Sequence, residues 1–293
     1  MNEPFLSIVT PTYNRANLLK NCFDSLCVQT DFDFEWIVID DGSTDDTEQL
    51  VNSFRADFPI LFEKQANGGK HTALNTAHQH VHGKYVLILD SDDQLIPTAV
   101  EQIKTEWKRY QDHTDIGIVT FLKGESVDKP TCMAPDEGVP VDIMRYRRKC
   151  YYSSDCCEVI RAELFLQYPF PVFEGERFLS EGALWNRVSF THQCVYVNRV
   201  IYLCDYQSDG LTKSGKRLRI RNPRGGMYTA NLNMNRKNYF SRRVKSGLLY
   251  TCYGCFAGDS PLAMLRRSDE KAMAAVCMPF GWMLYHYWKR KYQ

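Results

Sequence analysis

The stretch Tyr85-Val86-Leu87-Ile88-Leu89-Asp90-Ser91-Asp92-Asp93 joins an uninterrupted apolar run to three carboxylates. An apolar run of this kind is typical of a strand that is buried on both faces of a parallel sheet. Carboxylates so close together repel one another unless a cation neutralises them, and Mg²⁺ and Mn²⁺ prefer carboxylate oxygens. The stretch therefore predicts a buried strand that leads into a metal site at Asp90 and Asp92. The alternative is a solvated acidic loop or a helix cap.

Apolar runs alternate with segments of helical period throughout the first 125 residues. Besides the run at 85–89, strands are expected at residues 5–10, 36–39, 60–62 and 117–121. Strands that alternate with helices predict an α/β fold, in which helices cover both faces of a parallel sheet. Ligands bind such sheets at the carboxyl ends of the strands, so the loops that follow the strands should hold the chemistry. Those loops are residues 10–15, 40–45, 64–71 and 90–93.

Two of these loops carry side chains that suit a nucleoside. In Pro11-Thr12-Tyr13-Asn14-Arg15, Tyr13 can stack on a base and Arg15 can lie near a phosphate. The alternative for this loop is a plain connection in which Asn14 caps the following helix. Asp40-Asp41-Gly42-Ser43 follows another apolar run, and one carboxylate there can accept a hydrogen bond from a base N–H or a ribose hydroxyl. An Asp-Gly turn with a helix cap is the alternative there.

A glycine turn, Asn67-Gly68-Gly69-Lys70-His71, opens the next predicted helix. Glycine lets a ligand approach the backbone closely, and the start of a helix favours anions. Lys70 adds a point charge that suits a diphosphate. The turn is not a P-loop, because GxxxxGK[ST] is absent. Taken alone, it is equally consistent with an ordinary turn.

These elements, in this order and each after a strand, together resemble family 2 glycosyltransferases of the GT-A fold. The matching stretches are residues 7–15, 37–45, 67–75 and 87–93. The resemblance covers roughly residues 5–215 and is densest over the first 95. It implies a GT-A, Rossmann-like and mostly parallel sheet flanked by helices in residues 1–215. Residues 216–293 then form a basic, helical C-terminal region.

The resemblance also implies roles for individual residues. The residues that it assigns to the nucleoside are Thr10, Pro11, Tyr13, Arg15 and Asp40. It assigns ribose and a divalent metal, Mn²⁺ or Mg²⁺, to Asp90 and Asp92 of the Asp-x-Asp loop, and Ser91 between them is a further candidate for binding the donor. In the third loop Gly69 matches the family, but Leu74 stands where the family often has an arginine. Lys70 is therefore the candidate for the cation that touches the nucleotide.

Such an enzyme needs a carboxylate that deprotonates the acceptor hydroxyl. The family places it at the start of a helix, often as Glu-Asp, and here Glu181 and Gly182 occupy those two positions. Only Glu181 can be carried across as the base, with Glu176 and Asp155 as reserves. The alternative is that Glu181 caps its helix or pairs with Arg177.

The charge of the chain is unevenly spread. The net charge is +1, yet residues 213–293 contain 17 Lys and Arg against 3 Asp and Glu. This asymmetry suggests an anionic partner for the C-terminal part. Residues 213–221 suit a lid over the donor phosphates or a solvated basic loop. Aromatic and basic residues mix at 282–292, which suits either peripheral contact with an anionic membrane or a core helix with a basic tail. No nucleic-acid-binding motif is present.

The cysteines bear on the cellular compartment. There are 11, scattered along the chain, and no secretory signal precedes them. Reduced thiols and a cytoplasmic location are therefore expected, with any peripheral contact on the inner face of the cell membrane. The longest apolar run, residues 276–285, is shorter than the ~20 residues that a transmembrane helix needs.

The expected function is that of an inverting, metal-dependent glycosyltransferase. It would move a sugar from a nucleoside diphosphate donor, UDP by the resemblance, to a hydroxyl of a saccharide or lipid-linked acceptor in surface polysaccharide biosynthesis. One rival is a sugar-nucleotide nucleotidyltransferase, which needs a glycine-rich loop near the N-terminus, and residues 11–15 contain no glycine. The other rival is a non-catalytic protein that only binds a sugar nucleotide. Such a protein is expected to have lost the carboxylates that hold the donor, but here these carboxylates are present.

Overall fold

The computed structural model describes residues 3–144, 146, 156–204 and 211–292. The chain divides into two compact units. Unit 1 comprises Met1–Pro169 and Thr191–Tyr206, and unit 2 comprises Phe170–Phe190 and Gln207–Gln293. The reserve base Asp155 lies outside the described residues.

A single sheet forms the centre of unit 1, with strand order β3-β2-β1-β4-β9-β6-β10-β5. Its strands are β1 Leu6–Thr12, β2 Phe34–Asp40, β3 Ile60–Lys64, β4 Tyr85–Ile88, β5 Gln94–Leu95, β6 Ile116–Ser126, β9 Cys157–Arg161 and β10 Gln193–Leu203, with β7 Lys129–Pro130 and β8 Pro140–Val141 on its margins. The strands β1 to β4 are parallel to one another. The sequence did not predict β9, which lies antiparallel between β4 and β6 and makes the sheet mixed. The predicted α/β class is confirmed.

The carboxyl ends of the parallel strands meet at one edge of this sheet. The register pairs Thr12 of β1 with Asp40 of β2, and Asp40 with Lys64 of β3. Leu89, the residue after β4, donates its N–H to the carbonyl of Val9 in β1 at 2.9 Å. The loops after β1, β2, β3 and β4 therefore leave the sheet side by side, as the alternation of strands and helices predicted.

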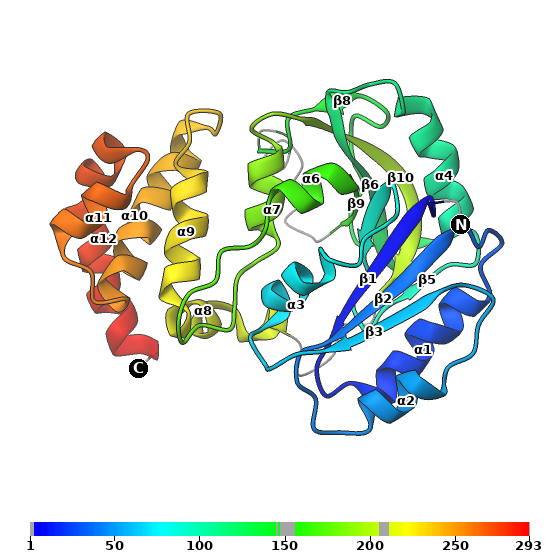
Figure 1. Ribbon diagram of the computed structural model, residues 1–293. Helices are drawn as coiled ribbons and strands as arrows, with labels where there is room; N and C mark the ends of the chain where they lie inside the picture. Colours follow the sequence, from blue (N-terminus) through cyan, green and yellow to red (C-terminus); the bar gives the residue numbers. More distant parts are fainter. Residues whose placement is uncertain (1–2, 145, 147–155, 205–210, 293) are drawn as a thin grey trace. The chain divides into compact units, whose positions relative to one another are not determined.

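Helices cover both faces of the sheet (Figure 1). On one face, α1 (Ala16–Cys27), α2 (Thr47–Ser53) and α4 (Ala99–Tyr110) bury apolar side chains in a shared core. Leu19, Phe23 and Leu26 of α1 pack there because they recur at helical spacing, and they join Ile8 and Trp36 of the sheet. The other face is covered by α3 (Lys70–Ala77) and α6 (Ala162–Gln167).

Unit 2 is helical, and its helices are α7 Gly182–Val188, α8 Leu211–Arg221, α9 Pro223–Asn233, α10 Phe240–Phe256, α11 Pro261–Arg267 and α12 Lys271–Tyr292. The basic segment 213–221 lies in α8, a helix with a break at Gly215, so the loop expected there is not found. Met234, Tyr250 and Trp288 belong to the core of the unit. Across the described ranges, no helix combines the length and the apolar character that crossing a bilayer requires.

Candidate active site

An acidic turn follows β4 at the carboxyl edge of the sheet. The N–H of Asp93 bonds to the carbonyl of Asp90 at 3.1 Å and closes the turn. The N–H of Asp90 donates to the hydroxyl of Tyr202 at 2.9 Å, and Lys70 forms an ion pair with the Asp90 carboxylate. Tyr202 is fully buried in β10. The turn is therefore held in place by Tyr202 of the sheet and by Lys70 at the start of α3.

The carboxylates of this turn differ in their pKa values. Burial raises the pKa of Asp90, but the charges of Lys70 and Lys123 outweigh it, so the net shift is downward. Burial, and then the charge of Asp90, raise the pKa of Asp92 above its usual range. The same two causes raise the pKa of Asp93 to about 7. The turn thus concentrates negative charge whose mutual repulsion a bound cation would relieve.

The residues present fit a divalent cation that shares its coordination with a ligand. Within the part of the chain that the structure describes, no three His, Cys, Asp or Glu side chains converge as a complete metal cage. Asp90 and Asp92 are the predicted ligands in the acidic turn, whereas Asp93, the third carboxylate, is buried and interacts with the Tyr202 hydroxyl. Mg²⁺ and similar ions are commonly held by one or two carboxylates together with substrate phosphates.

Asp41 holds the glycine turn in place. Its Oδ1 accepts hydrogen bonds from the N–H of Gly68 at 2.9 Å and from the side-chain amide of Gln65 at 2.7 Å. Its Oδ2 accepts the N–H of Gly69 at 2.7 Å. Gly69 has a φ of 95°, which disfavours any residue with a side chain, and it directly precedes Lys70, the first residue of α3. The sequence analysis assigned no separate role to Asp41.

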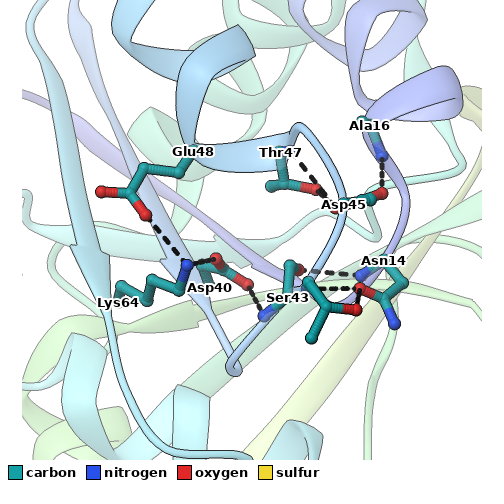
Figure 2. A network of polar contacts seen from close by, with 9 residues as sticks. Asn14, Ala16, Asp40, Ser43, Asp45, Thr47, Glu48 and Lys64 are labelled. Carbon is teal, nitrogen blue, oxygen red and sulfur yellow. Dashed lines mark hydrogen bonds and ion pairs between the residues drawn. The ribbon is translucent and has the colours of Figure 1, made fainter.

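Asp40 presents an unsatisfied carboxylate oxygen at the same edge. The side chain is fully buried, and its Oδ1 accepts the N–H of Ser43 at 2.8 Å. Its Oδ2 lies 3.8 Å from the Lys64 ammonium (Figure 2) and has no hydrogen-bond partner among the described residues. The hydroxyl of Thr12, its register neighbour in β1, is likewise buried without a partner there. Because an unmet buried oxygen is costly, these two positions, which are paired in the register, are candidates for contact with a polar ligand.

Figure 2 shows how the first two loops are fastened to each other. The N–H of Asn14 donates to the Ser43 hydroxyl at 2.8 Å, and the side-chain oxygen of Asn14 accepts the N–H of Thr44 at 2.8 Å. Asp45 accepts the N–H of Ala16 at 3.1 Å, at the start of α1. Asn14 therefore ties the loops together, at a φ of 51°, and the residue at the N-cap of α1 is Arg15.

The first loop contains two buried candidates and one exposed candidate. The hydroxyl of Thr10 accepts the indole N–H of Trp36 at 2.9 Å inside the sheet, so any ligand contact of Thr10 would have to come through its backbone. Pro11 is buried beside it. Tyr13 is 46% exposed, as a residue that stacks on a ligand needs to be.

Two basic side chains from other parts of the sequence, Arg15 and Lys123, act on the carboxylates of the acidic turn. Arg15, which the sequence analysis singled out, lowers the pKa of Asp92 through its charge, although burial raises that pKa more. Lys123 of β6, which the sequence analysis missed, lies 4.0 Å from the centre of the Tyr202 ring. Ser91, in the middle of the turn, is buried. Nothing in the local sequence around Lys123 indicates this role, because pairing of β6 with β10 creates the contact.

Glu181 and Glu176, the two candidate bases in the described part of the chain, lie in unit 2. Glu181 directly precedes α7, its carbonyl accepts the N–H of Leu184 at 2.8 Å, and its side chain makes no hydrogen bond that caps the helix. Glu176 is buried, and its two oxygens accept the N–H groups of Arg224 at 2.7 Å and Gly225 at 2.8 Å. Glu176 therefore stabilises the start of α9, where a carboxylate also favours the helix dipole. Glu181 as the base stays a prediction.

Comparison with known proteins identifies the family. The model described as "Glycosyl transferase family 2" matches residues 7–165, more than half of the 293 residues. The chondroitin synthase of Pasteurella multocida is 41% identical over 99 residues, which are 33% of this chain and 10% of that protein. Glycosyltransferase GlyA of Streptococcus pneumoniae is 34% identical over 113 residues, 38% of this chain and 16% of that protein. The chain thus spans well under a third of the length of these relatives.

Solved structures share the fold at low sequence identity. TarS 1–349 of S. aureus superposes with a TM-score of 0.66 at 16% identity, over 98% of this chain and 92% of that chain. The mannosyltransferase PcManGT of Pyrobaculum calidifontis, solved with GDP-Man and Mn²⁺, gives a TM-score of 0.58 at 17% identity, over 100% and 84% of the two chains. The match of the family model over more than half of the residues, together with this fold, shows that the chain belongs to glycosyl transferase family 2.

Proposed function

We propose that the protein is an inverting glycosyltransferase that transfers a sugar from a nucleoside diphosphate sugar to a hydroxyl of a saccharide or lipid-linked acceptor. The proposal rests on the observation that two features lie at the same edge of the sheet. These are the Asp40 oxygen that accepts no hydrogen bond in the described part of the chain and the ion pair between Asp90 and Lys70. One end of that edge suits a nucleoside and the other a charged diphosphate. TarS has been solved with UDP and with UDP-GlcNAc, which favours a uridine donor here.

The nucleoside would bind at the ends of β1 and β2. The Oδ2 of Asp40, which pairs with Lys64 at 3.8 Å but accepts no hydrogen bond in the described part of the chain, can accept one from a base N–H, and the neighbouring Thr12 hydroxyl can donate or accept one. The exposed ring of Tyr13 can stack on the base. Both buried oxygens would then be satisfied, which makes the complex more favourable than the empty edge.

The diphosphate would bind between the acidic turn and the start of α3. Asp90 and Asp92 would hold the ribose and a divalent cation, Mn²⁺ or Mg²⁺, which supplies positive charge next to the leaving diphosphate. Neighbours of the same fold were solved with Mn²⁺. Lys70 and Arg15 place further positive charge there, and the N-terminus of α3 adds its dipole.

The acceptor hydroxyl would be deprotonated by Glu181. An inverting transfer needs one base and a single displacement at the anomeric carbon, in which the acceptor oxygen forms the new bond as the bond to the diphosphate breaks. Glu176 is the weaker candidate for the base, because both of its oxygens already accept backbone N–H groups at the start of α9. The similar proteins include chondroitin and hyaluronan synthases of Pasteurella multocida. They support a role for this protein in the biosynthesis of a surface polysaccharide.

The test is turnover of a panel of nucleotide sugars with added Mn²⁺, read out as released nucleoside diphosphate in the presence of saccharide acceptors. Transfer with release of UDP or GDP supports the proposal. Release of pyrophosphate from a nucleoside triphosphate and a sugar phosphate would show a nucleotidyltransferase instead. Binding of a nucleotide sugar without any turnover would show a non-catalytic binding protein. The cytoplasmic location expected from the sequence is checked separately by fractionation.

A further inference from the structure

The C-terminal helix α12 has two apolar stripes, and its own unit covers only one of them. Ala274, Cys277, Gly281 and Trp288 are buried. At Gly281 a Cβ atom would lie 2.5 Å from the Cβ of Thr251 in α10, so the two helices touch along this stripe. This first stripe therefore belongs to the core of the helical unit.

The second stripe consists of Val276, Phe280, Met283 and Tyr287, called the outer stripe below. The intervals of four, three and four residues place these side chains on one side of the helix. They are 71%, 58%, 53% and 56% exposed. Trp282, 55% exposed, lies next to them in sequence. A surface helix of a soluble domain usually places polar residues where this stripe lies, and a continuous exposed apolar surface marks a binding site.

The charge along α12 indicates what covers the outer stripe. Residues 271–292 contain no Asp or Glu. An exposed Lys271 begins the helix, and Lys289, Arg290 and Lys291 are exposed in its last turn. Basic groups therefore stand at both ends of the apolar surface. The ammonium of Lys291 also lies 5.7 Å from the centre of the Tyr287 ring, which joins the basic end to the stripe.

We infer that the outer stripe of α12 docks on an anionic lipid surface. The apolar side chains would enter the boundary between headgroups and acyl chains, while the lysines and Arg290 meet the anionic headgroups. A second copy of the chain fits less well, because two α12 helices side by side in either direction bring basic ends together. The inference rests on the surface of unit 2 and does not depend on the proposed transfer reaction.

The experiment is co-sedimentation of the full chain with phosphatidylcholine vesicles, with and without phosphatidylglycerol. The protein should sediment with the anionic vesicles and stay in solution with the neutral ones. Val276→Glu should weaken binding at least about tenfold, since a carboxylate would have to approach hydrocarbon. Val127→Glu is the matched control, because Val127 is 56% exposed in the turn between β6 and β7 of the other unit, and it should bind as the unchanged protein does. Replacing Lys289, Arg290 and Lys291 with glutamine should weaken binding about a hundredfold.

Three results would overturn the inference. The first is equal vesicle binding by the Val276→Glu and Val127→Glu variants. The second is unchanged binding after the three basic residues are replaced. The third is a dimer in solution, seen by light scattering, that Val276→Glu dissociates, since a second copy would then cover the outer stripe. Each readout is independent of sugar transfer, so a failed turnover assay would leave this test intact.

Discussion

Replacing Asp41 with asparagine tests whether a carboxylate orders the glycine turn that precedes Lys70. Three donors point at this side chain, the N–H groups of Gly68 and Gly69 and the amide of Gln65, at 2.9, 2.7 and 2.7 Å. Asparagine keeps one acceptor oxygen but turns an NH₂ group toward the remaining donors. At least one hydrogen bond is then lost, and a donor faces a donor.

The size of the effect follows from the kind of bond that is lost. A hydrogen bond to a charged group contributes about 1.5–3 kcal/mol. A loss of about 2 kcal/mol that falls on the turn alone would lower nucleotide affinity about 30-fold, because each 1.4 kcal/mol is a factor of ten. The affinity should respond in this way because Lys70 directly follows the turn and pairs with Asp90 in the acidic loop.

The assay is titration of the protein with UDP in the presence of Mn²⁺ by calorimetry, with the free energy of unfolding measured in urea alongside. Asp33→Asn is the control, because Asp33 accepts the N–H of Phe5 at 3.0 Å at the other end of β2. The control should change stability slightly and nucleotide affinity not at all. The reasoning fails if Asp41→Asn binds UDP as tightly as the control does.

Three further variants address the charges and the base. Lys70→Met removes the cation that pairs with Asp90. The affinity for Mn²⁺ without nucleotide should therefore rise, and the affinity for UDP should fall about tenfold. Paramagnetic resonance of free Mn²⁺ measures the first affinity and calorimetry the second. Glu181→Gln should lower transfer at least about 100-fold and leave donor affinity unchanged, whereas Glu176→Gln should lower the urea midpoint because it weakens the cap of α9. Burial lowers the pKa of His78 below 6.5, so its stabilising contribution is complete above pH 6.5 and is lost as the pH falls toward the folded-state pKa. His78→Gln should therefore flatten the acid side of the stability curve, measured by urea unfolding between about pH 5 and 8.

The parallel half of the sheet and its carboxyl edge could be predicted from the sequence. Each of the strands β1 to β4 contains an apolar run, and each is followed by a loop that contains Asn or Asp. Alternation with helices makes these strands parallel, and parallel strands place the loops that follow them at one edge. Neighbouring positions such as Thr12 and Asp40 therefore follow from local patterns alone.

The rest of the site depends on contacts between distant parts of the chain. Strand β9 is only five residues long, and it exists because β4 and β6 both pair with it. The hydroxyl of Tyr202 reaches Asp90 from 112 positions away. The capping bonds of Glu176 likewise link it to residues 48 and 49 positions later in the chain. Local patterns carry no information about such pairings, so the sequence analysis named Glu176 only as a reserve base.

The charges around the acidic turn explain why the two effects of Lys70→Met should have opposite signs. Asp90 is balanced by Lys70 and Lys123, and Asp92 is influenced by Arg15, so the turn can fold with its carboxylates close together. A cation that arrives alone meets Lys70 as a competitor for Asp90, whereas a diphosphate that arrives alone meets the carboxylates as like charges. A cation and a diphosphate that bind together add positive and negative charge at the same time, so the net charge of the site changes little. The same lysine therefore opposes the metal alone and favours the nucleotide, which is the behaviour expected of a site built for a metal-bound diphosphate.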